Sequence, residues 1–389
     1  MKCAKSRHDL PAIYTSAVTK YPHQLNWHAF LGRPTLPSMS TEDLDALAQM
    51  PTLITGAGGS IGSALALRLA HFSPPRLALL ESSESNLIQL QQAWPGQVKT
   101  RAGASVAPGF FFGDAGDRAI LEEIFALHRP RIVFHAAACK HVPLLEQQPF
   151  AAIANNIFVT AALAAVAAEY GARVVLLSTD KAAQPASILG VTKRIAEEIV
   201  LAAAGTVLRL CNVLTSSGSV TEIFARQIAS GGPLTATDPA ARRYFLTMDE
   251  AVDLLLTAAH TDSSVLLAPA LPADHRIADL ASFMARELAP GSEIPIRFTG
   301  LRRGDKLTEQ LWDNDEQACP ATSCSGLLSI QPVRPEPAQF KSALTALRYA
   351  LRERDLAAAL GLLRALVPGY RPSEAVLALA QNDPRRIQV

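Results

Sequence analysis

The sequence has few cysteines, few aromatic residues and no excess of either charge. Lys and Arg number 36 against 35 Asp and Glu, and the net charge of +1 gives no electrostatic reason to expect nucleic acid or an anionic membrane as the main partner. The cysteines are odd in number and contain no CxxC pair, which argues against a disulfide framework and a zinc site and predicts a reduced, cytoplasmic setting without a metal. They are Cys3, Cys139, Cys211, Cys319 and Cys324.

Long hydrophobic runs are also missing. The basic N-terminus, "MKCAKSRHDLPAIYTSAV", is followed by no apolar segment of the signal-peptide kind, and runs such as "TAALAAVAA" are too short to span a bilayer. We therefore expect no membrane insertion. The apolar fraction of 49% is nevertheless ample for a core, and 389 residues suit one large α/β domain with a smaller appendage, or two modest domains.

Short apolar runs alternate with helical segments from residue 51 onward. The runs are "TLIT", "RLALLE", "FFF", "RIVFHAA", "RVVLLS" and "TVLRL", and the segments between them begin near Ser60, Glu84, Asp117, Gln148 and Ser187. This alternation is typical of βαβ units. It predicts an α/β fold with a doubly wound parallel sheet and helices on both faces.

The predicted chain has four parts. Residues 1–50 form a polar N-terminal arm in which Ser40 or Thr41 caps a short helix, and residues 51–212 form the Rossmann-type domain. Residues 213–334 form a smaller substrate-binding region, part of which can return to the sheet. Residues 335–389 have apolar residues at helical spacing and are predicted to form a tail of two helices.

A glycine array follows the first predicted strand. Gly56, Gly59 and Gly62 form GxxGxxG at the mouth of a helix, where glycines permit a tight turn and let backbone N–H groups approach a pyrophosphate. The second strand ends in Glu81, where a carboxylate would bind the adenosine ribose and repel a 2′-phosphate, which favours NAD over NADP. The alternatives are a tight turn without a ligand and a solvated Glu81.

The predicted NAD site takes residues from several strand ends. Asp114 can reach the adenine edge, although a helix N-cap role is the alternative. The complete predicted set is Gly56, Gly59, Ser60, Ile61, Gly62, Glu81, Asp114, Ala136, Ala137 and Lys193.

Five further segments carry a family resemblance. In the order "HAAACKHVPLLEQQP", "LLSTDKAAQP", "TKRIAEE", "GGPLTATDPAARRYFLT" and "GLRRGDKLTEQL", the chain resembles the nucleotide-sugar 4,6-dehydratases of the extended short-chain dehydrogenase/reductase family. More narrowly, it resembles the polysaccharide-biosynthesis branch that acts on UDP-N-acetylglucosamine. "LGRPTL" resembles the linker before the catalytic domain of membrane-anchored members, and "LRALVPGYRP" resembles their tail. The resemblance implies a soluble form without the membrane domain.

The resemblance also implies a reaction. Carbon 4 of the sugar is oxidised by hydride transfer to NAD, the carbon 5 proton and the 6-hydroxyl leave, and the hydride returns to carbon 6. Asp180 is then the acid for the 6-hydroxyl and Lys181 the base for carbon 5. A lysine base needs a pKa lowered by desolvation or by neighbouring cations such as Lys140. The alternative is that "STDK" is a solvated turn whose charges pair with each other.

Position 189 departs from the family pattern. Members of the branch carry Tyr or Met four residues before the lysine, on the same helical face, and the tyrosine phenol takes the 4-hydroxyl proton. Leu189 has no titratable proton. We expect Thr179, or a water that it holds, to relay this proton toward Lys193, while Ser178 hydrogen-bonds the 4-oxygen. Lys193 would still bind the nicotinamide ribose.

Polar residues at the carboxyl edge of the predicted sheet are candidates for substrate binding. Lys140, His141 and Glu146 follow the fourth strand, where a structural salt bridge is the alternative. The resemblance implies that the uridine diphosphate contacts a second group, in which a solvated surface role is the alternative for each arginine. This group is Asn212, Arg243, Arg302 and Lys306.

Other departures from the family pattern leave the sugar open. Larger side chains stand at expected glycines, an expected Arg is Ser217, and an expected Pro and His are also replaced. The changed positions are Val159, Cys211, Thr215, Ser217, Glu222 and Asp238. A non-catalytic nucleotide-sugar binding relative is therefore one alternative. A 4-epimerase or ketoreductase is another, although it would need the missing tyrosine.

Two apolar helical segments predict self-association. "AALAAVAAEYGA" and "ILGVTKRIAEEIVLAAA" are apolar enough to pair across a two-fold axis. We therefore expect a homo-oligomer, a dimer or larger.

Overall fold

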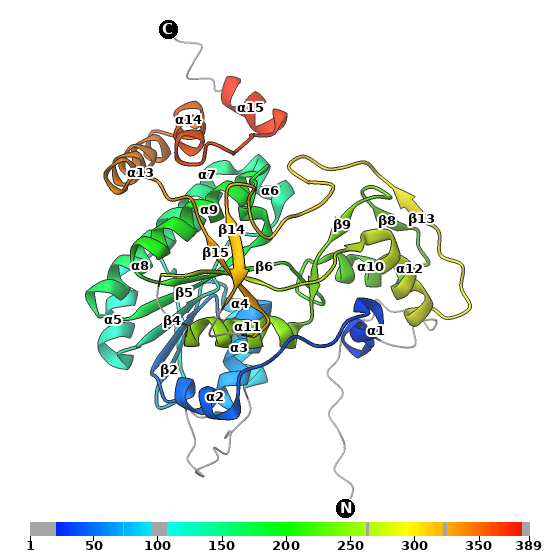
Figure 1. The fold of residues 1–389 in the computed structure, drawn as a ribbon, viewed down its shortest axis with the longest axis horizontal. Helices are drawn as coiled ribbons and strands as arrows, with labels where there is room; N and C mark the ends of the chain where they lie inside the picture. Colours follow the sequence, from blue (N-terminus) through cyan, green and yellow to red (C-terminus); the bar gives the residue numbers. More distant parts are fainter. Residues whose placement is uncertain (1–20, 73, 95–106, 262–263, 322–324, 383–389) are drawn as a thin grey trace, which may run out of the picture.

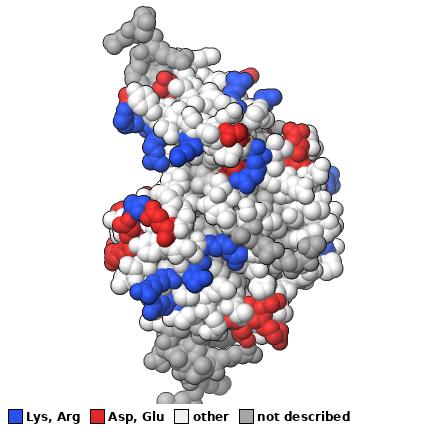
Figure 2. Space-filling model, turned by 60° about the vertical axis from the view of Figure 1, so that its left-hand side comes forward, with Lys and Arg blue, Asp and Glu red and all other residues white. Residues whose placement is uncertain are grey.

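The computed structural model describes residues 21–72, 74–94, 107–261, 264–321 and 325–382. Cys3, Cys324 and the first 20 residues of the predicted arm lie outside the described residues. Figure 1 shows a large layered domain with a smaller lobe on one side and a helical tail above it. On the face shown in Figure 2, groups of basic and acidic residues are interspersed, as the near-neutral net charge suggests.

A nine-stranded sheet forms the centre of the large domain. Its order is β14-β15-β11-β6-β5-β4-β1-β2-β3, parallel from β3 to β11, with β15 antiparallel to both of its neighbours. The strands are β1 (Thr52–Thr55), β2 (Leu77–Glu81), β3 (Gly109–Phe112), β4 (Ile132–His135), β5 (Arg173–Thr179), β6 (Thr206–Leu210), β11 (Leu266–Pro269), β14 (Gln317–Pro320) and β15 (Leu327–Gln331). The doubly wound sheet is confirmed, and its order reverses between β1 and β4, where such folds bind ligands at the carboxyl ends.

Helices cover both faces of the sheet (Figure 1). α3 (Ser60–Ala70) and α11 (Met248–His260) pack on one face, with α2 (Thr41–Ala48) against α11; Ser40 is the N-cap of α2. α5 (Arg118–His128), α8 (Thr160–Glu169) and α9 (Ile188–Ala202) pack on the other face, and α4 (Glu84–Ala93) lies beside β2 and β3. β1, β2 and β4 are buried along their whole length, as parallel strands between two helical layers require.

One helix is longer and more apolar than the sequence runs suggest. α7 (Pro149–Ala152), the π-helix η2 (Ile153–Val159) and α8 join into 21 helical residues, and the most apolar 18-residue window of this helix has a mean hydropathy of 1.9. By length and composition alone this helix could cross a membrane. In this structure 56% of its most apolar window is buried inside the protein, where α8 packs against α5 and α9.

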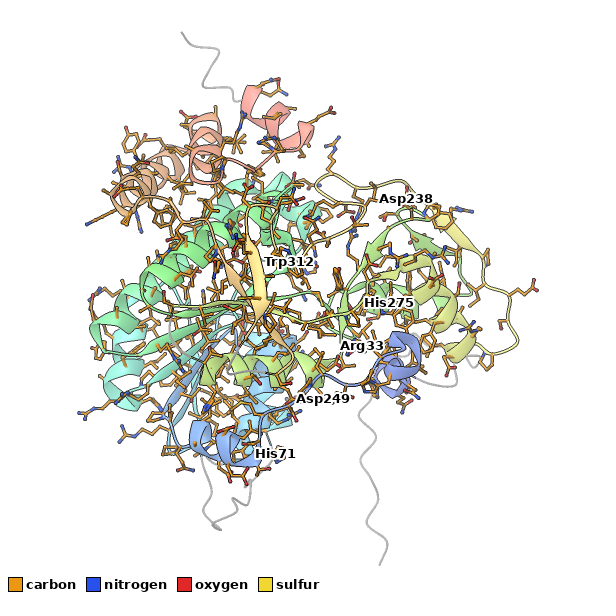
Figure 3. The ribbon with its side chains drawn as sticks, in the orientation of Figure 1. Arg33, His71, Asp238, Asp249, His275 and Trp312 are labelled. Atoms are coloured by element: carbon orange, nitrogen blue, oxygen red, sulfur yellow. The ribbon has the colours of Figure 1, made fainter. Side chains whose placement is uncertain are left out.

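The smaller lobe has its own core, which includes the segment around α1 of the N-terminal arm, whereas α2 of the same arm packs on the large domain. Leu31, Phe224 and Phe283 belong to this core, which joins α1 to the lobe helices. Arg33 follows α1 and donates two hydrogen bonds to the Glu250 carboxylate on α11, at 2.5 and 2.9 Å, so the arm also contacts the large domain (Figure 3). The arm and lobe elements are η1 (Pro22–Gln24), α1 (Trp27–Leu31), β7 (Asn212–Val213), α10 (Val220–Ala229), β8 (Leu234–Ala236), β9 (Arg242–Arg243), β10 (Phe245–Leu246), β12 (His275–Arg276), α12 (Ile277–Leu288) and β13 (Ile296–Phe298).

The described part of the tail, residues 335–382, contains three helices rather than the two expected for the tail. They are α13 (Pro337–Arg352), α14 (Leu356–Leu366) and α15 (Glu374–Gln381). The tail shares a hydrophobic cluster with α6 (Val142–Gln147), η2 and α9, and this cluster includes Ile195 and Ile199 of α9. The apolar α9 face that was expected to pair across a two-fold axis is therefore covered by the chain's own tail.

Candidate active site

The Asp180–Lys181 pair lies at the carboxyl end of β5. The short helix η3 (Asp180–Ala182) follows β5 directly, and the Thr179 hydroxyl oxygen caps it by accepting from Lys181 N. Asp180 is fully buried, and its Oδ1 accepts from Thr179 Oγ1 at 2.8 Å and from Lys181 Nζ at 2.9 Å. Its Oδ2 is buried without a hydrogen-bond partner among the described residues. The pair is thus not a solvated turn.

A second carboxylate, Glu309, lies beside Lys181 and was not singled out from the sequence. Its side chain is 2% exposed, and Oε1 lies 3.8 Å from Lys181 Nζ. Burial would lower the pKa of Lys181, but Asp180 and Glu309 outweigh it, and the pKa of Lys181 is raised. A lysine that acts as a free-amine base would need a lowered pKa, so the shift of Lys181 is opposite to the one expected. The nearby cation that opposes it is Arg243, not Lys140.

Ser178 and Thr179 point in different directions from those expected. Ser178 Oγ is buried and donates to Glu197 Oε1 on α9 at 2.5 Å, away from Asp180. Successive side chains of a strand alternate between faces, so only one of the two neighbours can face the Asp180 carboxylate. Thr179 donates to Asp180 rather than toward Lys193. The expected contact of Ser178 with the 4-oxygen and the expected direction of the Thr179 relay both differ from this geometry.

Glu197 belongs to a buried ionic cluster behind the site. Arg209, on β6, is fully buried and pairs with Glu197 at 2.7 Å and with Glu316 at 2.6 Å. Burial would raise the pKa of Glu316, but Arg209 outweighs it, and the pKa of Glu316 is lowered to about 2. In the sequence, Arg209 is one residue of the short apolar run "TVLRL", and nothing in that run indicates an ion pair.

Leu189 and Lys193 lie on α9 beside the end of β5. Leu189 is buried in the hydrophobic cluster that α6 and α9 share with the tail. Lys193 Nζ donates to Leu177 O at 2.6 Å, and burial, which outweighs the attraction of Glu197, lowers the pKa of Lys193 to about 8. Burial and the Lys193 charge also lower the pKa of His135, on β4, to about 3, so its imidazole is neutral.

The glycine array forms a tight cradle between β1 and α3. Gly56 has φ +67, and a Cβ there would lie 2.6 Å from Ala137 N, while a Cβ on Gly62 would collide with the carbonyl oxygen of Gly56. Gly59 is the N-cap residue of α3, which places Ser60, Ile61 and Gly62 in the first turn. The structure therefore brings the glycines together with Ala136 and Ala137 at one edge of the sheet.

The two acidic residues of the predicted NAD site lie at the ends of β2 and β3. Glu81 is buried and accepts from Gly58 N and Ser83 N, both at 2.9 Å. It is therefore not a solvated charge. Asp114 Oδ1 accepts from Gly116 N at 2.7 Å, and the N-cap of α5 is Asp117, so the N-cap alternative for Asp114 is excluded.

Lys140, His141 and Glu146 have different surroundings. Lys140 Nζ donates to Ser217 O at 2.6 Å, and Ser217 N donates to Ser60 Oγ of the glycine loop at 2.9 Å. The His141 ring lies where a Cβ on the neighbouring Gly218 would be 2.5 Å from it. Glu146 is buried and accepts from Ile188 N at 2.7 Å and from Ser373 Oγ at 2.5 Å. It thus joins α9 to the tail through hydrogen bonds, a structural role, although these are not the salt bridge given as its alternative.

The four residues expected around the diphosphate do not form a clamp of free cations. Asn212 Nδ2 donates to Tyr244 O at 3.3 Å. Arg243 donates to the carbonyl oxygens of Lys306 and Leu307, at 2.8 and 3.1 Å. The side chain of Lys306 is 19% exposed, and its Nζ contacts other protein groups. Arg302 is 56% exposed and pairs with Asp305 at 2.8 Å.

The remaining sequence expectations concern cysteines, metals and a replaced glycine. Cys139, Cys211 and Cys319 are free thiols, and within the described residues no group of three or more His, Cys, Asp or Glu could hold a metal. Thr215 stands where the family pattern has Gly, and its φ of +63 is the left-handed conformation that glycine adopts without strain. The backbone there keeps the glycine-type conformation despite the side chain.

Comparison with known proteins agrees with this geometry. A family described as "Polysaccharide biosynthesis protein" matches residues 52–328. The probable polysaccharide biosynthesis protein EpsC of Bacillus subtilis is 36% identical over 295 residues, covering 74% of this chain and 49% of that protein. The UDP-glucose 4-epimerase of Rickettsia canadensis is 34% identical over 282 residues, covering 68% of this chain and 78% of that protein.

Among solved structures, Pen from Bacillus thuringiensis is similar with a TM-score of 0.65 and 28% identity, covering 73% of this chain and 88% of that one. The dTDP-glucose 4,6-dehydratase DesIV from Streptomyces venezuelae, solved with NAD, has a TM-score of 0.56 at 20% identity and shares the fold. The chain spans about half the length of EpsC and of the capsular polysaccharide biosynthesis protein CapD of Staphylococcus aureus. A family match over residues 52–328, on a Rossmann-type sheet, shows that the chain belongs to the polysaccharide biosynthesis protein family, whose fold is that of the extended short-chain dehydrogenases/reductases.

Proposed function

We propose that the chain is an NAD-dependent nucleotide-sugar 4,6-dehydratase that acts on UDP-N-acetylglucosamine and gives a UDP-4-keto-6-deoxy sugar. The observation that carries the proposal is the ion pair between the fully buried Asp180 and the partly buried Lys181 at the carboxyl end of β5. Asp180 Oδ2 has no hydrogen-bond partner among the described residues, and burying an unpaired carboxylate oxygen is costly. A substrate hydroxyl that donates to this oxygen would satisfy it.

The residues present fit NAD. A Cβ would fill the space at Gly56 and Gly62, so the loop is built for close approach to a pyrophosphate at the N-terminus of α3. Glu81 uses two of its acceptor sites on backbone N–H groups and keeps capacity for the adenosine ribose hydroxyls. Lys193 would hold the nicotinamide ribose. When bound, NAD would accept a hydride from carbon 4 and return it to carbon 6.

Asp180 and Lys181 share one transferable proton across their 2.9 Å contact. Moving it from Lys181 Nζ to Asp180 Oδ1 gives a free amine and a neutral acid without a change in net charge. The amine can then take the carbon 5 proton while the acid protonates the departing 6-hydroxyl, which leaves as water. The ion pair is restored at the end of this step. The raised pKa of Lys181 means that the ion-pair form predominates in the free protein.

The surroundings of the glycine loop support binding of a nucleotide sugar. Lys140 donates to the carbonyl oxygen of Ser217, and the Ser217 N–H donates to the hydroxyl of Ser60 in the glycine loop. These contacts place a cation close to the phosphate cradle. Arg302 remains largely exposed on the loop after β13 and can reach an anionic ligand. We keep Lys140, His141, Asn212 and Arg302 as proposed substrate contacts.

A 4-epimerase is the second candidate, because the Rickettsia canadensis relative carries that name. The test is to incubate the protein with UDP-N-acetylglucosamine in deuterated water and to follow the sugar by NMR. A dehydratase gives a 4-keto-6-deoxy product labelled at carbon 5, whereas an epimerase gives the galacto isomer. A binding protein gives neither product but still perturbs the ligand signals.

The matched variants are Lys181→Ala in the site and Lys341→Ala on the exposed face of α13. We expect Lys181→Ala to abolish the carbon 5 exchange and Lys341→Ala to leave it unchanged. Full exchange in Lys181→Ala would refute the assigned base.

A further inference from the structure

The loop of residues 183–187 joins the Asp180–Lys181 pair to α9, and its backbone is strained. Gln184 has φ +42, in the left-handed region, where a residue with a side chain is disfavoured by about 1–2 kcal/mol. Such a conformation persists only when its surroundings hold it in place. Asp313 Oδ2 accepts from Gln184 N at 3.3 Å, and Arg371 N of the tail donates to Pro185 O at 3.3 Å. Residues far apart in the sequence therefore hold this loop in place through hydrogen bonds.

The Lys306 ammonium group hydrogen-bonds to the backbone of this loop. Its Nζ donates to Ala183 O at 3.0 Å and to Gln184 O at 3.3 Å. The buried Glu309 carboxylate balances the charge of the ammonium, with Oε2 at 2.8 Å from Lys306 Nζ, although this oxygen makes no hydrogen bond within the described residues. Two of the three N–H donors of this ammonium are therefore used on backbone carbonyl oxygens, and its charge is already balanced by a carboxylate rather than left for a phosphate.

Glu309 connects this contact to Lys181. Its carboxylate is 2% exposed and lies 3.8 Å from Lys181 Nζ and 3.9 Å from Arg243 Nε. Arg243 in turn donates to the carbonyl oxygens of Lys306 and Leu307 and so braces the segment that carries Lys306. Within the described residues, removing the Glu309 charge would leave Asp180 as the one carboxylate at ion-pair distance from Lys181, and none at that distance from Lys306 or Arg243.

We propose that Lys306 and Glu309 are positioning residues that fix the strained loop and the Lys181 ammonium, rather than contacts to the nucleotide diphosphate. The consequence for turnover rests on the proposed function. The consequence for the loop does not, because it follows from the contacts alone.

The two roles of Lys306 predict different measurements. A positioning role predicts that Lys306→Met lowers kcat, on the order of 100-fold if the Asp180–Lys181 pair shifts by about 1 Å, with little change in UDP affinity. A diphosphate contact predicts a loss of UDP affinity of roughly 10- to 100-fold, the worth of a charged hydrogen bond. Lys306→Gln keeps two N–H donors but no charge, so it should retain loop order better than Lys306→Met.

The experiment combines hydrogen exchange, followed by mass spectrometry on peptides covering residues 179–188, with UDP binding by calorimetry and turnover. The variants are Lys306→Met, Lys306→Gln and Glu309→Gln, with Lys341→Met as the exposed control. We expect several-fold faster exchange of this segment in Lys306→Met, intermediate exchange in Lys306→Gln, and wild-type exchange in the control. In Glu309→Gln, the pKa of Lys181 should fall, which moves the acid limb of the kcat profile to lower pH.

Wild-type exchange of residues 179–188 in Lys306→Met would overturn the proposal, as would a loss of UDP affinity with an unchanged loop. If the wild-type protein turns over none of the sugars tested, the proposed function fails. The exchange data still decide the positioning role in that case.

Discussion

Replacing Lys193 by Met should make the protein more stable at neutral pH. The Lys193 ammonium is buried against Leu177 O, and its pKa falls from 10.5 to about 8, chiefly because of burial and in spite of Glu197. At about 1.4 kcal/mol for each pKa unit, charging the buried amine at pH 7 costs about 3 kcal/mol. Methionine removes this cost but leaves the Leu177 carbonyl without its donor, which costs about 1 kcal/mol. The net gain at pH 7 is about 2 kcal/mol.

The sign of the pH dependence distinguishes this explanation from a packing effect. Between pH 8 and 10.5 the native state has released the Lys193 proton while the unfolded chain still holds it, so wild-type stability rises with pH. The advantage of Lys193→Met should therefore shrink above pH 8, vanish at about pH 9.5 and reverse at higher pH. Urea unfolding at pH 7 and pH 9.5, without added dinucleotide and with Lys341→Met as control, measures it. Lower stability of the variant at pH 7, or a difference independent of pH, would refute the reasoning.

Three further outcomes are expected. Glu316→Gln should destabilise the fold by about 3 kcal/mol in urea unfolding, because Arg209 stays buried with one carboxylate fewer. Gly62→Ala should abolish dinucleotide binding, measured by NADH fluorescence, because the added Cβ collides with the backbone of Gly56. Gly361→Ala in α14, where the space is open, should keep dinucleotide binding and raise the free energy of unfolding by about 1 kcal/mol. Leu189→Tyr should lower the stability by about 1–3 kcal/mol through overpacking without raising the turnover, which thermal unfolding and product NMR test.

Much of the fold could be predicted because its signals are local. The six parallel strands from β1 to β6 are short apolar runs between helix signals, and Ser40, Asp117 and Ser187 are N-caps at the predicted helix starts. The tail was predicted less well, since Gly369 and the prolines around it hide a third helix, α15. The cover over α9 could not be predicted, because an apolar helix face looks the same whether a second copy or the chain's own tail packs on it.

The chemistry of the site depends on contacts between distant segments, which no local pattern contains. The sequence places Asp180 and Lys181 side by side, but their protonation depends on Glu309, more than a hundred residues away. Likewise, Lys306 looks like a phosphate ligand until the carbonyl oxygens of Ala183 and Gln184 are seen around its ammonium. The sequence locates charged residues near the site, whereas only the fold shows which of their hydrogen bonds are already made.

The contacts around Leu189 bear on the first step of the proposed reaction. Its surroundings are the hydrocarbon cluster shared by α6, α9 and the tail, so a phenol at this position would lack the polar partner that a buried tyrosine hydroxyl needs. In the proposed reaction, the 4-hydroxyl proton would therefore have to be taken by another group. Thr179 already donates its hydroxyl proton to Asp180. Lys193 lies on the same helix as Leu189, and burial lowers its pKa to about 8, so its ammonium loses a proton close to neutral pH. Because the lowered pKa of Lys193 makes its neutral amine available near pH 8, whereas the pKa of Lys181 is raised, we infer that in the proposed reaction the neutral Lys193 accepts the proton of the oxidation step and the Asp180–Lys181 pair serves the elimination.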